Sequence, residues 1–381
     1  DLKDLGQNAY PLVAMKGGFA DYTIGDVKIE KVTGAPLYEF GITQTHYSIE
    51  GRDIIREASL EEYNDDNKAG SYVHKPKAIS LWDDYDYSKG HHWAMAIDLN
   101  SCTGCSACIV SCSIENNVPI VGREEVRRRR EMHWLRIDRY YSFEAPAKKD
   151  LSLSIVHGGD QTVEAGEQMT KEKVMEAYSD SSEDKDTAYD YYQNVRVAHQ
   201  PMMCQHCDNA PCETVCPVLA TTHSSEGLNQ MTYNRCIGTK YCGNNCPYKV
   251  RRFNWFRYNE NDKFDYHFSN DLGKMVINPD VTVRSRGVME KCSFCVQRIQ
   301  TTKLAAKREN RKMNTDEFTT ACAQTCPSNA IVFGDLNDKN SEIAKLYAND
   351  RSYHVLEELG VKPSVQYMTK IRNKKATTNQ K

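Results

Sequence analysis

The sequence predicts an α+β fold, in which two small cysteine-rich modules share one chain with long insertions and a β-rich N-terminal segment. Three observations lead to this prediction. All 15 cysteines of the chain fall in four short clusters. Runs with alternating apolar residues indicate strands, and longer runs with helical spacing indicate helices. No apolar run approaches the roughly 18 residues that suggest a membrane-spanning helix.

The composition narrows the class of protein. A chain of 381 residues is long enough for two or three domains, or for one domain with long insertions. Its formal net charge is −3, whereas a nucleic-acid-binding protein usually carries a basic excess. The mean hydropathy of −0.67 indicates a soluble chain. Because the sequence begins with Asp1 and shows no signal peptide, we expect a mature or partial chain, cut from a longer polypeptide.

The cysteine clusters have the spacing of ligand sets. The first is spaced C-x2-C-x2-C-x3-C and the second C-x2-C-x4-C-x3-C. In chain order they are Cys102, Cys105, Cys108 and Cys112; Cys204, Cys207, Cys212 and Cys216; Cys236, Cys242 and Cys246; and Cys292, Cys295, Cys322 and Cys326. Two thiolates separated by two residues can reach neighbouring irons of one cubane. The last cysteine, often followed by proline, ligates the other cluster of a pair.

Iron–sulfur ligation explains these cysteines better than three other uses. Disulfides explain neither the triplets nor the odd count. Zinc needs two pairs for each tetrahedral site, which the second and fourth clusters could supply, but the first cluster has the ferredoxin pattern. Catalytic or redox-active thiols would not need 15 copies. We therefore predict two ferredoxin-like modules of the 2[4Fe-4S] type.

The first half of the chain alternates between these modules and cysteine-free stretches. Residues 1–90 are predicted to be β-rich, with strand-like runs over 22–32 and 38–43. The first module combines residues 91–145 with residues 285–340. It includes a charged, arginine-rich stretch, residues 123–139, which is typical of a solvated or partner-facing surface rather than of nucleic-acid binding. The core candidates after that stretch are Trp134, Ile137 and Tyr140. His91 and His92 are expected to be structural, although they could lie near a cluster.

The second half contains the other module. Residues 146–192 are predicted to be an acidic insertion with a helix near 167–178, either a solvated lobe or a docking surface for a basic partner such as a cytochrome. The second module covers residues 193–260, with a hairpin over 221–230. Its aromatic and basic run, residues 247–256, is either a strand or a segment folded over a cluster.

The last part of the chain contains a second insertion and two predicted helices. The insertion covers residues 261–284. A helix is predicted over 287–312, with Cys292 and Cys295 near its start. Residues 331–333 are expected to close the core. Residues 341–381 are predicted to be a C-terminal helix, 343–359, followed by a basic tail.

Four stretches resemble the four-cluster electron-transfer subunits of the molybdopterin oxidoreductase family. They are residues 109–119, 202–217, 246–254 and 290–295. Such subunits carry electrons in polysulfide, dimethyl sulfoxide and nitrate reductase-like complexes. More narrowly, residues 1–70, 127–141 and 353–373 are similar to the iron–sulfur subunit of bacterial alternative complex III. In that family a domain that resembles a molybdopterin enzyme, without molybdenum, precedes the ferredoxin-type domain, so residues 1–90 would be the end of such a domain.

The resemblance implies which cysteines share a cluster, because it pairs the first motif with the fourth and the second with the third. Three [4Fe-4S] clusters are implied, on Cys102, Cys105, Cys108 and Cys326; on Cys292, Cys295, Cys322 and Cys112; and on Cys204, Cys207, Cys212 and Cys246. A fourth site takes Cys236, Cys242 and Cys216, and Thr239 stands where a fourth cysteine is expected. Three thiolates suit a [3Fe-4S] cluster, since hydroxyl oxygen is a poor ligand for such iron. The alternative is a [4Fe-4S] cluster with hydroxyl or water on one iron.

The resemblance also implies the partners of the subunit and its location in the cell. The subunit would lie peripherally on the periplasmic face of a bacterial inner membrane, docked on a polytopic quinol-binding subunit. Electrons from quinol would enter at the [3Fe-4S] end and leave toward haem c subunits, cytochrome c or a terminal oxidase. No catalytic acid or base is expected in this chain. Two other classes stay open: an electron-transfer subunit of a molybdopterin reductase, and a stand-alone ferredoxin-like carrier.

Overall fold

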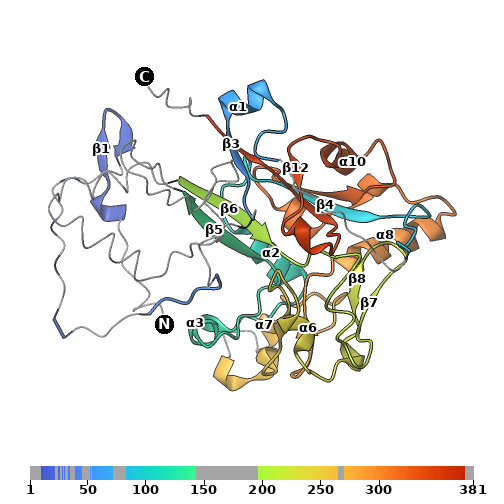
Figure 1. Ribbon diagram of the computed structural model, residues 1–381. Coiled ribbons are helices and arrows are strands. Elements are labelled where there is room, and N and C mark those ends of the chain that lie inside the picture. Colours follow the sequence, from blue (N-terminus) through green and yellow to red (C-terminus); the bar gives the residue numbers. More distant parts are fainter. Residues whose placement is uncertain are drawn as a thin grey trace, which may run out of the picture. The chain divides into compact units, whose positions relative to one another are not determined.

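The chain contains two compact units, Asp1–Phe40 and Gly41–Lys381. A computed structural model describes residues 10–21, 25, 28, 30, 33–34, 39–44, 52, 54–71, 83–142, 196–264 and 270–373 (Figure 1). In the smaller unit, a 3-10 helix η1 (Tyr10–Leu12) precedes the antiparallel strands β1 (Ala14–Lys16) and β2 (Phe19–Asp21). Gly17 and Gly18 close this hairpin at φ of +59° and +84°, backbone angles that glycine adopts without strain.

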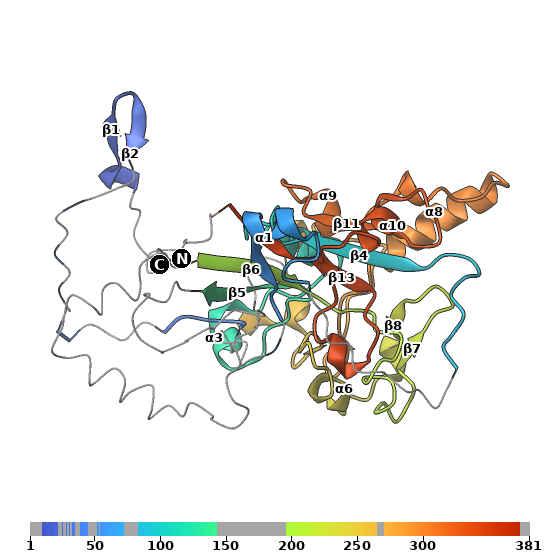
Figure 2. The same ribbon diagram turned by 45° about the horizontal axis from the view of Figure 1, so that its top comes forward.

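A four-stranded sheet forms the centre of the larger unit. Its order is β11 (Ile331–Asp335), β4 (Trp93–Asp98), β13 (Val365–Met368) and β12 (Ser352–Tyr353). β4 runs antiparallel to β11 and parallel to β13, so the strand that leads into the first cysteine cluster lies between two strands from the end of the chain (Figure 2).

The two faces of β4 contact different parts of the core. Trp93, Met95 and Ile97 are fully buried in the main hydrophobic core, which also contains many of the cysteines. Ala94 and Ala96 point to the opposite face and pack against Ile343 of α10 (Glu342–Tyr347). Alternate residues of a strand face opposite sides, and strands covered on both sides are apolar throughout, as β4 is.

The remaining described strands of the larger unit pair two by two. β3 (Glu57–Ser59) runs parallel to β14 (Lys370–Arg372). The antiparallel pairs are β5 (Arg136–Ser142) with β6 (Arg196–Met202), β7 (Thr221–His223) with β8 (Asn229–Met231), and β9 (Arg252–Phe253) with β10 (Met289–Glu290). The β5–β6 ribbon and the β7–β8 hairpin lie well apart in the larger unit (Figure 1).

Short helices connect these strands. Besides α10 they are α1 (Leu60–Asp65), α2 (Ala107–Glu115), α3 (Gly122–Arg127), α6 (Tyr241–Asn244), α7 (Asp271–Lys274), α8 (Val296–Arg308) and α9 (Ala321–Gln324). The 3-10 turns among the described residues of this unit are η3 (Tyr233–Arg235), η4 (Tyr258–Glu260), η5 (Asp262–Phe264), η6 (Thr315–Glu317) and η7 (Glu357–Leu359). Among the described helices, none has both the length and the apolar character that crossing a bilayer requires.

Several expected elements are present. The mixture of helices and strands agrees with an α+β fold. Trp134, Ile137 and Tyr140 are buried, and the last two lie on β5. The hairpin expected over residues 221–230 is β7–β8, and the strand expected over 331–333 is part of β11. Both modules lie in one compact unit, residues 41–381.

Two predicted helices are wrong in their bounds. The helix expected over 287–312 begins only at Val296, because Phe294 and Cys295 have φ near +50°, which a right-handed helix does not accommodate. The C-terminal helix expected over 343–359 ends at Tyr347, where Ala348, Asn349 and Asp350 form a turn. The chain then supplies β12, β13 and β14, so the expected basic tail begins only after strands of the core.

The N-terminal prediction is also corrected. Of the run expected to be a strand over 38–43, the described residues 39–43 are not a strand. Gln44 instead contacts β5 through its side chain, since Gln44 Nε2 donates to Arg139 O at 2.9 Å and Gln44 Oε1 accepts from Arg139 N at 2.6 Å. Most of the expected strand over 22–32, the insertion over 146–192 and its helix over 167–178 lie outside the described residues.

The position of β13 generates a testable prediction. Tyr367 is fully buried, and its hydroxyl donates to Pro201 O at 2.8 Å. Tyr367→Ala should destabilise the protein by about 3–5 kcal/mol through the cavity it leaves. Tyr367→Phe, which loses only the hydrogen bond, should cost about 1–3 kcal/mol. Thermal unfolding of the purified variants measures both, and an unchanged midpoint in Tyr367→Ala would contradict the placement of β13.

Candidate iron–sulfur sites

The first cavity of interest is lined by Cys102, Cys105, Cys108 and Cys326, together with apolar side chains that include Ile137 and Ile331. β4 leads into the loop that holds Cys102 and Cys105, and α2, which begins at Ala107, carries Cys108. Gly104 has φ of +72°, and a Cβ there would lie 2.6 Å from the His199 ring. The loop therefore requires glycine at position 104, because any side chain there would collide with the His199 ring. Cys105 is exposed, so this cavity lies next to the protein surface.

The second set brings together cysteines from three segments. Cys112 lies on α2, Cys292 and Cys295 precede α8, and Cys322 lies on α9. Asn116 Nδ2 lies 3.6 Å from Cys112 Sγ and 3.7 Å from Cys295 Sγ, so one amide contacts two of these sulfurs.

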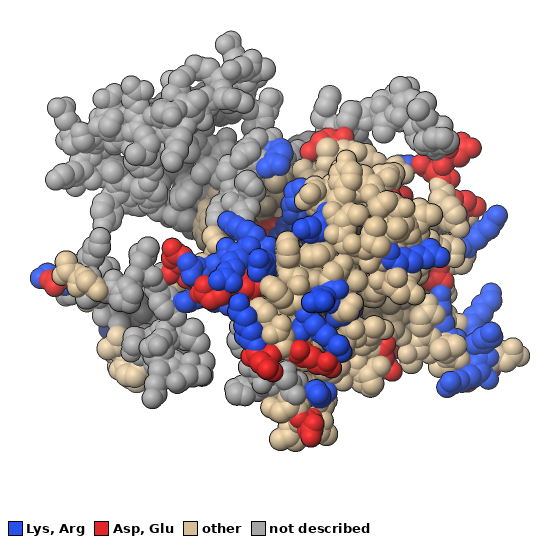
Figure 3. Space-filling view, turned by 90° about the horizontal axis from the view of Figure 1, so that it is seen from below, with Lys and Arg blue, Asp and Glu red and all other residues tan. Residues whose placement is uncertain are grey.

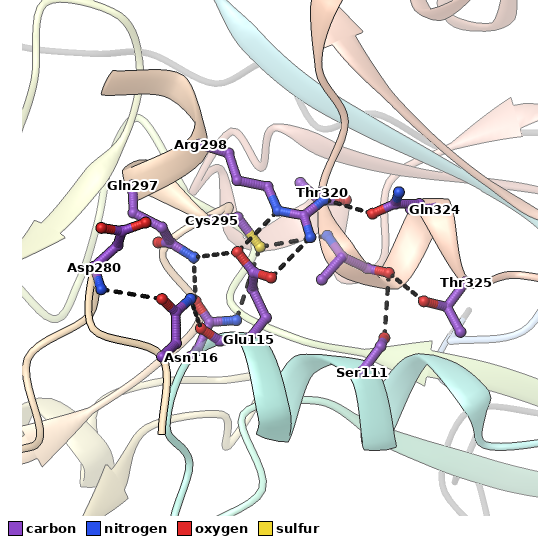
Figure 4. A network of polar contacts seen from close by, with 12 residues as sticks. Ser111, Glu115, Asn116, Asp280, Cys295, Gln297, Arg298, Thr320, Gln324 and Thr325 are labelled. Carbon is purple, nitrogen blue, oxygen red and sulfur yellow. Dashed lines mark hydrogen bonds and ion pairs between the residues drawn. The ribbon is translucent and has the colours of Figure 1, made fainter. Parts of the chain in front are cut away.

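An ion pair fixes the helices that carry the second set. Figure 4 shows Arg298 of α8 facing Glu115 of α2 beside Cys295, with 2.7 Å between Arg298 Nη2 and Glu115 Oε2. Arg298 also donates to Thr319 O at 3.0 Å and to Gln324 Oε1 at 2.8 Å, which ties α8 to α9. The pair is partly exposed, so its effect is mainly to hold the three helices together.

The third set lines a second cavity. Cys204, Cys207, Cys212 and Cys246 surround it, and Asn229 and Arg251 complete its wall. All four cysteines are buried. They come from the segment between β6 and β7 and from the segment after α6, which places both motifs of the second module on one cavity.

The fourth set consists of Cys216, Cys236 and Cys242, two of which lie near Arg251. Cys216 Sγ accepts from Ala220 N at 3.2 Å, and Cys236 Sγ accepts from Met289 N at 3.4 Å. Cys216 and Cys242 both lie near the Arg251 guanidinium. None of these contacts places Cys236 or Thr239 beside the other two sulfurs. Thr239 is exposed and lies in the loop before α6.

The four sets follow one another through the protein. The pKa of the Cys108 thiol is raised by burial and by the nearby Cys322 sulfur, so the first set adjoins the second. The pKa of the Cys292 thiol is raised by burial and by sulfurs that include Cys322 and Cys204, so the second set adjoins the third. Arg251 lies close to both Cys212 and Cys242, so the third set adjoins the fourth.

The chemistry of the donors fits clusters of iron and sulfide. Burial raises the pKa of the Cys108, Cys212 and Cys322 thiols to about 12 each, so these groups become thiolates only next to positive charge, which iron supplies. Burial also favours a higher pKa for the Cys326 thiol. Hydrogen bonds from Ser328 and from the Ala330 N–H outweigh this effect, so the pKa of Cys326 is lowered. Such N–H donors also adjust cluster potentials.

A single metal ion fits less well. Four thiolates on one zinc would lie about 4 Å from each other, given Zn–S bonds of about 2.3 Å. In the part of the chain that the structure describes, no three His, Cys, Asp or Glu side chains converge closely enough to hold one ion. The first and third sets nevertheless line common cavities, an arrangement that suits a larger multinuclear group.

The arginine-rich stretch is largely neutralised. Glu124 pairs with Arg123 and Arg127, and the buried Glu125 pairs with Arg128 and Arg130. Figure 3 shows Lys and Arg side chains lying among Asp, Glu and uncharged residues on this face, without one continuous basic surface. This stretch therefore gives no support to a phosphate-binding surface.

His91 and His92 have structural contacts. His91 Nδ1 lies 2.6 Å from Asp335 Oδ2, and its ring stacks on Trp93. The His92 ring stacks on Tyr87. The sequence interpretation missed the polar groups that contact the sulfurs, namely Asn116, Asn229 and Arg251. Of these three residues, only Arg251 was indicated by the sequence, because it lies in the aromatic and basic run after Cys246.

Comparisons with known proteins agree with this geometry. Residues 195–264, which hold the second and third cysteine motifs, match the model of a 4Fe-4S dicluster domain. The iron–sulfur cluster-binding subunit of a menaquinone reductase from Nitratidesulfovibrio vulgaris is 31% identical over 282 residues, 73% of this chain and 89% of that protein.

Two archaeal relatives are similar to about the same degree. The iron–sulfur subunit of a putative dimethyl sulfoxide reductase from Halobacterium salinarum is 30% identical, over 73% of this chain and 79% of its own. An iron–sulfur subunit of an Hdr-like menaquinol oxidoreductase from Archaeoglobus fulgidus is also 30% identical, over 72% and 82%. All three matches extend well beyond the dicluster domain.

The buried pair Arg284–Glu290 gives a prediction about the second site. Arg284 Nη2 lies 2.8 Å from Glu290 Oε2, and both side chains are almost inaccessible to solvent. Glu290 is the last residue of β10 and lies two residues before Cys292. Glu290→Ala leaves a buried charge without a partner and should cost about 3–5 kcal/mol. The thermal midpoint should fall, and iron should be lost faster on heating.

The exposed pair Arg257–Glu260, 2.9 Å long, provides the matched control. Glu260→Ala should cost less than about 1 kcal/mol. Equal losses of stability in the two variants would mean that burial of the Arg284–Glu290 pair has no particular importance for the site.

Proposed function

The chain belongs to the ferredoxin-type iron–sulfur subunits of reductase complexes, and we propose that it conducts electrons between a membrane subunit and a catalytic subunit. The membrane subunit would bind a quinone and the catalytic subunit a molybdopterin cofactor, as in the dimethyl sulfoxide reductase type. One observation carries the proposal: the cysteines lie in four neighbouring sets, the first of which reaches the surface at Cys105.

The cofactors would be three [4Fe-4S] clusters and one [3Fe-4S] cluster. Cys102, Cys105, Cys108 and Cys326 would hold the first; Cys112, Cys292, Cys295 and Cys322 the second; Cys204, Cys207, Cys212 and Cys246 the third; and Cys216, Cys236 and Cys242 the [3Fe-4S] cluster. Such clusters supply one-electron transfer without moving a proton. The protein's part is to hold the thiolates, to exclude water from the buried sets and to fix nearby charges.

Near the fourth set the surface is apolar and aromatic: Ile237, Tyr241 and Leu219 are each more than half exposed and lie close in sequence to Cys236, Cys242 and Cys216. Apolar patches of this kind are typical of subunit contacts. We assign this end to the membrane subunit and the Cys105 end to the catalytic subunit.

The names of the relatives support a quinone as one electron partner, because two of them are a menaquinone reductase and a menaquinol oxidoreductase. The putative dimethyl sulfoxide reductase subunit supports a molybdopterin reductase. From the family resemblance alone we add a peripheral position on the periplasmic face of the inner membrane. The runner-up is an alternative complex III-like quinol oxidase chain, with haem c, cytochrome c or a terminal oxidase as acceptor.

Metal analysis of the complex, purified with its membrane partners, separates these functions. A reductase should contain molybdenum, and quinol should reduce the clusters of this chain. Reduction by quinol without molybdenum, in a complex that contains haem c, would replace the reductase by the alternative complex III-like function. A chain that purifies alone from the aqueous fraction would contradict both and indicate a stand-alone carrier.

The [3Fe-4S] cluster can be tested at Thr239. Thr239→Cys supplies a thiolate where the register lacks one, so the oxidised protein should lose its [3Fe-4S] signal in electron paramagnetic resonance. A fourth [4Fe-4S] signal should appear on reduction. Thr239→Ser, which keeps a hydroxyl, should leave the spectrum unchanged. A wild-type protein without the [3Fe-4S] signal would contradict the assignment directly.

A further inference from the structure

Two buried cations, one in the second module and one just before Cys292, have no carboxylate partner among the described residues. Arg251 is 7% exposed and Lys291 1%. Their buried neighbours Arg252 and Arg284 behave differently, since each forms a 2.8 Å ion pair, with Glu131 and with Glu290. A buried charge is costly without a partner of opposite charge. The negative partner of Arg251 and Lys291 must therefore be another kind of group.

Arg251 is held beside the third set of cysteines. Its Nη1 donates to Cys212 Sγ at 3.4 Å, and its Nη2 donates to Thr221 Oγ1 at 2.7 Å and contacts Met231 Sδ at 3.2 Å. Nε has no partner. Thr221 and Met231 pair across the β7–β8 hairpin, so this hairpin fixes the guanidinium between Cys212 and the fourth set.

Lys291 lies near enough to the same sulfur to act on the pKa of its thiol. Its Nζ donates to Asn229 O and, at 2.8 Å, to Cys292 O, which places it between the second and third sets. Asn229 joins the two cations: its Oδ1 accepts from Arg251 Nη1 at 3.4 Å, while its Nδ2 lies 3.7 Å from Cys212 Sγ. Cys212 Sγ is therefore in contact with a guanidinium and an amide, and the Asn229 residue that supplies the amide also binds Lys291.

The sulfurs are the negative partners in this arrangement. Burial alone would lower the pKa of the Arg251 guanidinium, but the sulfurs of Cys212, Cys242 and Cys204 hold it above its ordinary value. Burial raises the pKa of the Cys212 thiol, and Arg251 and Lys291 both oppose that rise. Thiolates that carry an anionic iron–sulfur group satisfy both cations.

We propose that Arg251 and Lys291 are positioning residues that raise the reduction potential of the cluster on Cys204, Cys207, Cys212 and Cys246, with that cluster as their counter-ion. The inference rests on the proposed function, because it requires a cluster at this site. Reduction adds one electron and no proton there, so the negative charge increases by one. Two fixed positive charges in a buried site favour the more negative, reduced form.

Neutralising the guanidinium tests the proposal. In Arg251→Gln, measured in the complete complex by redox titration followed with electron paramagnetic resonance, the potential of one [4Fe-4S] cluster should become more negative. The iron content should stay unchanged. Arg251→Lys, which keeps the charge, should restore most of the wild-type potential. Asn229→Asp keeps both cations but adds a carboxylate beside them, and it should shift the same potential in the negative direction.

Two controls separate charge from packing. Arg252→Gln removes a buried arginine that Glu131 already neutralises, and Lys249→Gln removes an exposed cation from the same segment. Both should leave the potentials close to those of the wild type. A shift in Arg252→Gln as large as that in Arg251→Gln would overturn the proposal, because loss of packing would then explain both.

The remaining outcomes of the titration also test the proposal. Unchanged potentials with full iron in Arg251→Gln overturn the inference while leaving the proposed function intact. If the Arg251→Gln variant loses its iron, the reduction potential is measured in Asn229→Asp and in Lys291→Met instead. An unchanged cluster potential in either of these variants overturns the proposal. Absence of [4Fe-4S] signals from the wild-type complex would instead contradict the proposed function itself.

Discussion

Sulfur atoms in the interior of this protein need positive charge around them. Cys108, Cys204, Cys207, Cys212, Cys242, Cys246 and Cys322 belong to the same buried cluster as Trp93, Ile97 and Val365. As free thiols such groups add little to a core, because burial favours their neutral form and leaves cavities between them. As ligands of iron they become cross-links between segments far apart in the sequence, such as those of Cys102 and Cys326, and metal binding then contributes to folding.

The surrounding structure satisfies this need in two ways. Backbone N–H groups donate to the more accessible sulfurs, for example from Ala330 to Cys326 and from Met289 to Cys236. Side chains also contact buried sulfurs, including the Asn116 amide at Cys112 and the Arg251 guanidinium at Cys212. The Arg284 guanidinium, whose charge is cancelled by Glu290, stabilises strand β10, which precedes Cys292.

The four cysteine motifs could be predicted from the sequence, because cysteines that bind one cluster from a single loop must lie at short, fixed spacings along the chain. The family resemblance supplied the pairing, which spacing alone leaves open. Helix bounds failed where backbone conformation depends on the site: Phe294 and Cys295 adopt left-handed angles in the turn that precedes α8. The strands β13 and β14 were missed because their partners, β4 and β3, lie far away in the sequence. The contact of Asn229 with Cys212 Sγ and the bonds of Lys291 to Asn229 O and Cys292 O depend on tertiary structure and have no local signal.

The central claim is that this one chain holds four clusters and that the fourth lacks an iron. Native mass spectrometry of the subunit released from its complex tests it most directly, because the mass above that of the polypeptide counts iron and sulfide together. The account predicts the added mass of three [4Fe-4S] groups and one [3Fe-4S] group. The added mass of zinc ions, or of only two clusters in the intact chain, would contradict it.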